Sequence, residues 1–209
     1  MTFGLVKHNN NSISAITSGG ALAQGKMTLI KEQTASSSSS ISFVNGSSSV
    51  VLDNTYPIYV FKFINLNPAT DDKKFQFNLS ADTGSNYNVS KTSTYFSAYH
   101  NESGSSTSLA YRTGNDLANG TGVQVFTESA GNGSDESAVG ELTLFNPSST
   151  TFVKHFIART STYYVSDYAM DVYTAGYANT TSAIDAIQFS VESGGNFDGT
   201  IKLYGIKDS

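Results

Sequence analysis

The side chains that could perform catalysis are few and widely separated in this chain of 209 residues. The three histidines are His8, His100 and His155, and none belongs to a His-Glu-x-x-His motif. The sequence contains no Gly-x-Ser-x-Gly motif. A serine nucleophile needs an adjacent base, so the many serines do not by themselves indicate a hydrolase.

Acidic residues offer two further candidates for chemistry. The segment 131–137 carries Asp135 and Glu136 on a flexible loop, and Ca²⁺ prefers such oxygen ligands, but the segment lacks the fixed ligand spacing of an EF-hand. Asp167 and Asp171 flank three residues, and glycoside hydrolysis uses two carboxylates about 5–9 Å apart. Nothing in the sequence fixes their separation. We therefore predict no catalytic residue, no cofactor and no metal site, and a protein that is not an enzyme.

Composition restricts the class of partner. The chain has 12 basic and 17 acidic residues and a net charge of −5, whereas nucleic acids and anionic membranes attract clustered Lys and Arg. It has no cysteine, which excludes a disulfide scaffold and a thiol nucleophile. No apolar run approaches the ~20 residues of a membrane-spanning helix, and the N-terminal residues do not resemble a signal peptide. Proteins are the partners that this composition favours.

Short runs of alternating apolar and polar residues indicate β-strands. Phe75–Leu79 and Ile187–Val191 alternate strictly, and clusters of Ser, Thr, Asn and Gly between such runs predict turns. Asp71 and Asp72 are expected at a charged hairpin tip. Most of the phenylalanines in these runs are expected in the core, namely Phe61, Phe63, Phe75, Phe77, Phe152 and Phe156. The predicted strands span 27–32, 39–44, 58–66, 73–80, 92–99, 123–127, 139–145, 151–158, 162–174, 184–191 and 200–206.

This spacing of strands predicts an all-β fold, an antiparallel two-sheet β-sandwich of the jelly-roll type, over residues 27–209. Residues 1–26 show no sustained period and are interpreted either as a frayed terminus or as an extended arm that docks on a neighbouring subunit by strand addition. We adopt the assembly arm as the prediction. Its anchors would be the spaced apolar residues Phe3, Leu5, Val6, Ile13, Ile16 and Leu22.

Tyrosines gather near the expected turns and strand ends. A tyrosine ring is apolar and its hydroxyl is polar, so it suits subunit interfaces and also sugar stacking, and the sequence does not separate these uses. Because charge is scarce and tyrosine abundant, we expect a homo-oligomer, with a trimer as the guess. The interface candidates are Tyr163, Tyr164, Tyr168, Tyr173 and Tyr177.

Several stretches together resemble a family of structural proteins from tailed phages of aquatic bacteria. The stretches are 59–70 (Tyr-Val-Phe-Lys-Phe-Ile-Asn-Leu-Asn-Pro-Ala-Thr), 144–157, 199–207, 4–10 and 27–34. The likeness covers nearly the whole chain, but its motifs do not reveal the place of the family on the virion. It supplies no catalytic residues.

The resemblance implies a virion component. A β-sandwich with an arm suits a capsid decoration or cement protein, which would bind the major capsid protein or other virion proteins through its arm and one sheet edge. A tail-fibre or tail-tip module that binds host-surface glycans is the alternative. A polysaccharide-degrading enzyme ranks third.

Overall fold

The computed structural model describes residues 27–207. The predicted arm, residues 1–26 with its six apolar anchors, lies outside the described residues. Within residues 27–207, no helix is long and apolar enough to cross a membrane.

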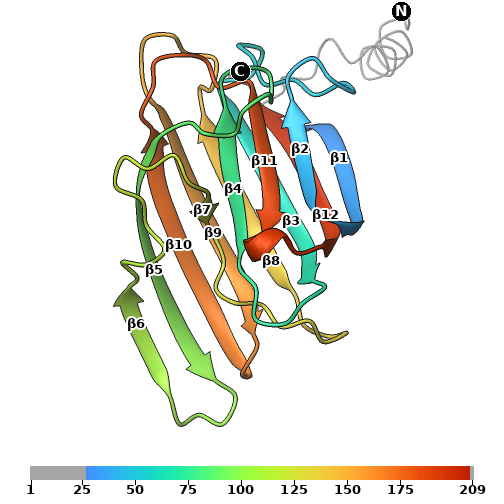
Figure 1. The fold of residues 1–209 in the computed structure, drawn as a ribbon, viewed down its shortest axis with the longest axis vertical. Coiled ribbons are helices and arrows are strands. Elements are labelled where there is room, and N and C mark those ends of the chain that lie inside the picture. Colours follow the sequence, from blue (N-terminus) through green and yellow to red (C-terminus); the bar gives the residue numbers. More distant parts are fainter. Residues whose placement is uncertain (1–26, 208–209) are drawn as a thin grey trace, which may run out of the picture.

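The described chain forms two antiparallel sheets of unequal width, stacked face to face (Figure 1). The large sheet contains, in spatial order, β1 (Met27–Ser38), β12 (Phe197–Ile206), β3 (Ile58–Pro68), β8 (Ala138–Phe145), β9 (Lys154–Tyr164), β10 (Tyr168–Ala178), β5 (Lys91–Asn101) and β6 (Thr107–Tyr111). The small sheet contains β2 (Ser40–Val44), β11 (Ala186–Val191), β4 (Phe75–Ser80) and β7 (Gln124–Val125). The one helical element in this part of the chain is a 3₁₀ turn, η1 (Glu192–Gly194). The predicted all-β, two-sheet sandwich is confirmed, and the finer jelly-roll likeness stays a prediction.

Alternation along each strand decides which residues face the core. In β9 every second residue from Lys154 to Thr162 is buried, and the residues between them are exposed. His155 and Ile157 therefore point away from the core, and Phe156 points into it, as the sequence predicts for Phe156. We call the side of the large sheet that faces the small sheet its inner face, and the opposite side its outer face.

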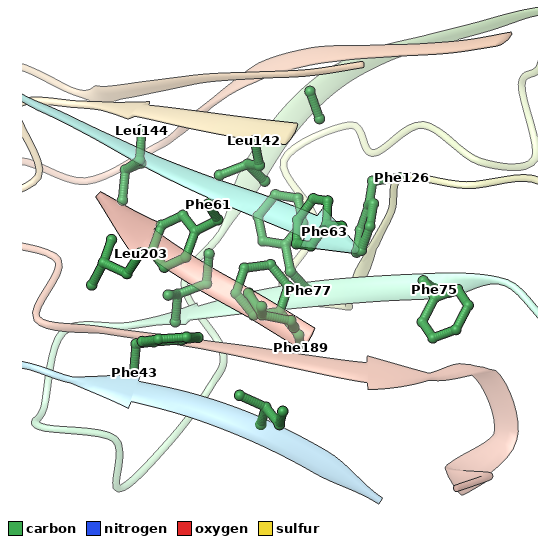
Figure 2. Close-up of a cluster of buried hydrophobic side chains, with 14 of the residues drawn as sticks. Phe43, Phe61, Phe63, Phe75, Phe77, Phe126, Leu142, Leu144, Phe189 and Leu203 are labelled. Carbon is green, nitrogen blue, oxygen red and sulfur yellow. The ribbon is translucent and has the colours of Figure 1, made fainter. Parts of the chain in front are cut away.

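A layer of aromatic rings fills the space between the sheets (Figure 2). Phe189 of β11 lies at its centre, with ring centroids of Phe61 and Phe63 on β3 both 5.2 Å away. Its ring also meets those of Phe43, Phe77 and Phe126 within 6.4 Å. Five of these six rings are exposed by 1% or less, so the layer excludes water and joins both sheets.

The structure corrects several details of the sequence prediction. The predicted strand 162–174 is interrupted by a turn at 165–167, where Asp167 has a φ of +63° and reverses the chain between β9 and β10. The predicted strand 151–158 begins only at Lys154, and Phe152 lies in the preceding loop, 70% exposed rather than in the core. Strand β6 was missed because its five residues, Thr-Ser-Leu-Ala-Tyr, follow the turn-like cluster Ser-Gly-Ser-Ser at 103–106.

The acidic pair Asp71 and Asp72 is also placed differently from the prediction. The pair is exposed, but the two flanking strands do not pair with each other, because β3 belongs to the large sheet and β4 to the small sheet. The segment is therefore a connection between the sheets and not a hairpin tip.

Truncating the central ring should destabilise the sandwich strongly. Phe189→Ala removes the ring that five others contact, and we expect it to lower the free energy of unfolding by about 4 kcal/mol. The control is Phe152→Ala, which shortens an exposed ring and should change that free energy by less than about 0.5 kcal/mol. Urea unfolding followed by circular dichroism measures both, and equal effects would contradict this description of the core.

Candidate binding surfaces

The small sheet covers only part of the large one. Its rings contact residues of β3, β9 and β12, as in the pairs Phe43–Phe61, Phe77–Phe156 and Phe75–Phe197. Strands β10, β5 and β6 continue beyond this contact (Figure 1). Their inner face is covered instead by the connection 112–137, whose residue Gly120 forms a β-bridge with Lys91 of β5.

The side chains under this connection form a buried polar layer. Ser93 Oγ donates a hydrogen bond to Gln124 Oε1 at 2.6 Å and accepts one from the Leu117 backbone N–H at 2.9 Å. Lys91 is fully buried, and its Nζ donates to the side-chain carbonyl of Asn78 and to the Val89 carbonyl at 2.8 Å. Burial lowers the pKa of Lys91 from 10.5 to about 8, since the charged amine loses its hydration. The bonds of Ser93 tie the connection to β5, and those of Lys91 tie β5 to β4.

At one end of the connection, between it and the large sheet, lies a cleft of about 670 Å³, which we call the tyrosine cleft. Tyr99, Tyr111, Tyr164 and Tyr168 line it, from β5, β6, β9 and β10. The Tyr168 ring lies edge-on to the rings of Tyr99 and Tyr164, with centroids 5.2 and 5.7 Å away. Burial, with the charges of Asp72 and Glu128, raises the pKa of Tyr164. The cleft therefore presents several ring faces and their hydroxyl groups.

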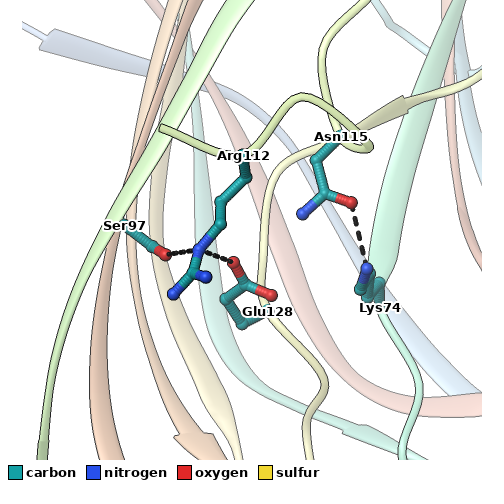
Figure 3. Close-up of polar contacts among 5 residues, drawn as sticks. All are labelled: Lys74, Ser97, Arg112, Asn115 and Glu128. Atoms are coloured by element: carbon teal, nitrogen blue, oxygen red, sulfur yellow. Dashed lines mark hydrogen bonds and ion pairs between the residues drawn. The ribbon is translucent and has the colours of Figure 1, made fainter. Parts of the chain in front are cut away.

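Charged and amide groups of the connection, together with Lys74 just before β4, complete the cleft (Figure 3). Arg112 Nε donates to Ser97 Oγ at 3.0 Å and lies 3.8 Å from Glu128 Oε1. Lys74 Nζ donates to Asn115 Oδ1 at 3.0 Å. Glu128 Oε1 is buried, and it accepts no hydrogen bond within the described chain. The nearby Tyr95 hydroxyl is likewise buried without a partner, and its burial raises the pKa of Tyr95.

These groups suit binding better than hydrolysis. A ligand with many hydroxyl groups could stack on the tyrosine rings and form hydrogen bonds with the polar side chains that line the cleft. Glycoside hydrolysis uses a pair of carboxyl groups, whereas Glu128 is the one carboxylate among the residues that line the cleft.

The outer face of the large sheet carries a row of cross-strand neighbours, one from each of its eight strands. The first four, from β1 to β8, are Glu32, Lys202, Lys62 and Glu141. The row continues from β9 to β6 as Arg159, Tyr173, Phe96 and Tyr111. Tyr111 lies on the edge strand β6, where it also lines the tyrosine cleft, and its hydroxyl donates a hydrogen bond to Asp116. We call these eight residues the cross-sheet row.

Neighbours in the cross-sheet row bind one another. Lys202 pairs with Glu32 at 3.0 Å, and Lys62 pairs with Glu141. Arg159 pairs with Asp171 of β10 at 2.9 Å, and its guanidinium lies 4.8 Å from the centre of the Tyr173 ring.

The second half of the row is aromatic, and exposed apolar residues flank it. The Tyr173 and Phe96 rings stack with centroids 4.9 Å apart and an angle of 5° between planes. Beside the row, Ile157 is 52% exposed and Leu109 71% exposed. The outer face therefore presents ordered charges among apolar surface.

The five tyrosines predicted as interface candidates divide between these two surfaces. Tyr164 and Tyr168 line the tyrosine cleft. Tyr163, Tyr173 and Tyr177 lie on the outer face, because they alternate with buried residues of β9 and β10. Sequence reasoning did not single out Arg112, Glu128 or the cross-sheet row, since their neighbours are distant in the sequence and local patterns do not reveal them.

The acidic candidates do not come together in one site. Asp167 lies in the β9–β10 turn and accepts a hydrogen bond from the Tyr163 hydroxyl at 3.0 Å, whereas Asp171 pairs with Arg159. In the loop 131–137, Glu136 accepts a hydrogen bond from the Gly133 backbone N–H at 2.6 Å. Among residues 27–207, no group of three or more His, Asp or Glu side chains is arranged to hold a metal ion.

Comparison of the chain with protein-family models finds no matching family, and comparison with curated proteins finds no match either. What the tyrosine cleft and the outer face bind therefore has to be argued from their own chemistry.

The buried amine of Lys91 should make stability depend on pH. Because its pKa is about 8 in the folded state and near 10.5 in the unfolded chain, the unfolded chain holds more protons between these values, so stability rises with pH across this window. Relative to Lys91→Met, the wild type should gain about 2 kcal/mol in free energy of unfolding from pH 8 to pH 10.

Urea unfolding at several pH values measures this difference, with Lys207→Met at an exposed position as the control. A constant difference between the wild type and Lys91→Met would contradict the pKa assigned to Lys91.

Proposed function

We propose that this chain is a structural protein of a tailed-phage virion, a decoration or cement protein on the outer surface of the head. Its partners are the major capsid protein or other virion proteins, together with further copies of itself. The resemblance of its sequence to phage structural proteins is the basis of this proposal. One structural observation supports it further: among residues 27–207, strand β1 is paired on one side only.

Strand β1 is the terminal strand of the large sheet and pairs with β12 on one side. It begins at Met27, where the predicted assembly arm ends. An edge strand presents unpaired backbone N–H and C=O groups, to which an extended segment of another protein can add as a further strand. From Lys31 to Ala35 the register with β12 is regular, so this stretch suits strand addition. The arm and this edge would together bind the shell.

The scarcity of charge fits such attachment. Lys, Arg, Asp and Glu make up 14% of the chain, so its contacts with the shell would depend on backbone hydrogen bonds and apolar burial. Salt therefore reduces the strength of such contacts only slightly. Many identical weak contacts on one particle act together and reinforce attachment.

Deleting residues 1–26 tests this proposal. We expect the shortened chain to keep the β-sandwich but to be lost from purified particles, because the arm and the β1 edge act together. Gel analysis and a particle map that locates the full-length chain measure incorporation. The control is Phe152→Ala, which alters an exposed ring in the β8–β9 loop and should leave incorporation unchanged. Normal incorporation of the shortened chain would contradict the role of the arm, and a location off the head would contradict the decoration role.

The tyrosine cleft favours a second candidate function, that of a tail-fibre or tail-tip module that binds host-surface glycans. Its four tyrosines offer ring faces for sugar stacking, and Arg112, Asn115 and Glu128 offer hydrogen-bonding groups beside them. Sugar binding of this kind requires the cleft, which shares Tyr111 alone with the cross-sheet row, and does not require the β1 edge, so the two functions can be tested separately.

Two pairs of tyrosine variants test the glycan function. Tyr164→Ala and Tyr168→Ala remove rings that line the cleft, and each should weaken binding to an array of bacterial surface oligosaccharides by about tenfold. Tyr163→Ala and Tyr173→Ala remove rings from the outer face and should leave this binding unchanged. Equal losses in all four variants, or no oligosaccharide bound by the wild type, would contradict this candidate.

A further inference from the structure

We propose that the outer face of the large sheet binds a second copy of this chain about a two-fold axis. The axis lies in the plane of contact, runs parallel to the strands and passes between β8 and β9. The proposal specifies the self-association that belongs to the proposed function, but it does not depend on attachment to the shell. Its support is the order of residues in the cross-sheet row.

When a second copy is placed over the first with its cross-sheet row in reverse order, the facing residues have complementary chemistry. The axis between β8 and β9 places each strand over the strand that lies equally far on the other side of the sheet. Glu141 then faces the partner copy's Arg159, and Lys62 faces the partner copy's Tyr173. Lys202 faces Phe96 in the same way, whereas Glu32 lies opposite Tyr111, whose hydroxyl already donates to Asp116. The three inner kinds of opposed pair are therefore one ion pair and two cations over aromatic rings.

The charge balance of the outer face also permits this contact. With Asp171, the row holds three acidic and three basic side chains, and their charges cancel. The net charge of −5 therefore lies elsewhere on the chain. Two copies can approach through the outer face without the repulsion that opposes approach through their other surfaces.

The same row disfavours the competing two-fold arrangement. An axis that runs along the row, perpendicular to the strands, would place each residue over its own copy. Glu141 would then face Glu141, and Lys62 would face Lys62. Like charges placed together across an interface are strongly unfavourable. The order of charges therefore selects one orientation, and composition alone, which suggested a trimer, carries no such information.

The area available is sufficient for a stable pair. Six strands at about 4.8 Å spacing, over about ten residues of 3.4 Å each, present roughly 1,000 Å² per copy. A stable interface buries about 800 Å² per partner. The pair of Glu141 with the partner copy's Arg159 is formed twice and lies at the centre.

Charge reversal at this central pair tests the proposal. We expect the full-length wild type to sediment as a dimer at micromolar concentration. Glu141→Arg places two like-charged pairs across the axis, and so does Arg159→Glu, so each variant alone should dimerise at least about 100-fold more weakly. An equimolar mixture of the two variants restores both opposite-charge pairs and should again form dimers. Weakened contacts within one chain cannot produce this rescue.

Matched controls separate this contact from general charge effects. Asp135→Arg changes the net charge as Glu141→Arg does, and Lys207→Glu changes it as Arg159→Glu does, both at exposed positions off the outer face. Both controls should dimerise like the wild type. Circular dichroism confirms that each variant keeps its β-sheet content.

A cysteine cross-link gives a second measurement that leaves the charges intact. The chain has no cysteine, so Ser161→Cys on the exposed side of β9 provides one thiol beside the proposed axis. A short bis-maleimide should link two copies through this thiol. Thr34→Cys on β1 lies roughly 30 Å from its symmetry mate and should not be linked.

Three results would overturn the proposal: a monomeric wild type, no rescue in the mixture, or equal cross-linking at both positions. None of them bears on whether the chain is incorporated into virions.

Discussion

The difference in width between the two sheets is the constraint on which the rest of this molecule depends. A four-stranded sheet can bury only part of an eight-stranded one, and the aromatic layer around Phe189 fills that part. The remaining inner face, on β10, β5 and β6, has to be covered by other means. The connection 112–137 covers it with polar contacts, and the tyrosine cleft opens where that cover ends.

The inner face therefore changes character along the sheet. Under the small sheet it is apolar, so ring packing specifies it. Under the connection the inner face holds Lys91 and Ser93, which lie beside Gln124 of the connection. The polar groups of these three side chains need hydrogen-bond partners because the side chains are buried. Polar contacts of this kind have strict geometry, so they position the wall of the cleft more exactly than apolar packing would. Two of the four buried side-chain oxygens that have no hydrogen-bond partner in the described chain, on Tyr95 and Glu128, lie where this polar layer meets the cleft.

Local patterns in the sequence predict the strands but not the surfaces. Period-two alternation locates eleven of the twelve strands at least approximately, since it reflects burial on one face of a sheet. It fails at 165–167, because the β-branched and aromatic residues on both sides conceal a turn that depends on the backbone of Asp167. It also cannot assign the tyrosines to a surface or find the cross-sheet row. Glu32, Lys62, Glu141, Arg159 and Lys202 become neighbours only through the order of strands, which no local pattern contains.

Attachment through the β1 edge and pairing through the outer face are physically independent. Strand addition extends the sheet within its own plane and uses backbone groups, which are the same at every residue. Pairing stacks a second sheet on the first and uses side chains in a fixed order. One copy can therefore hold a shell subunit at its edge and another copy on its face at once. In the proposed arrangement each pair of copies would attach to the shell twice, once through each copy, so that release requires both edge contacts to open together, which strengthens attachment without any new contact.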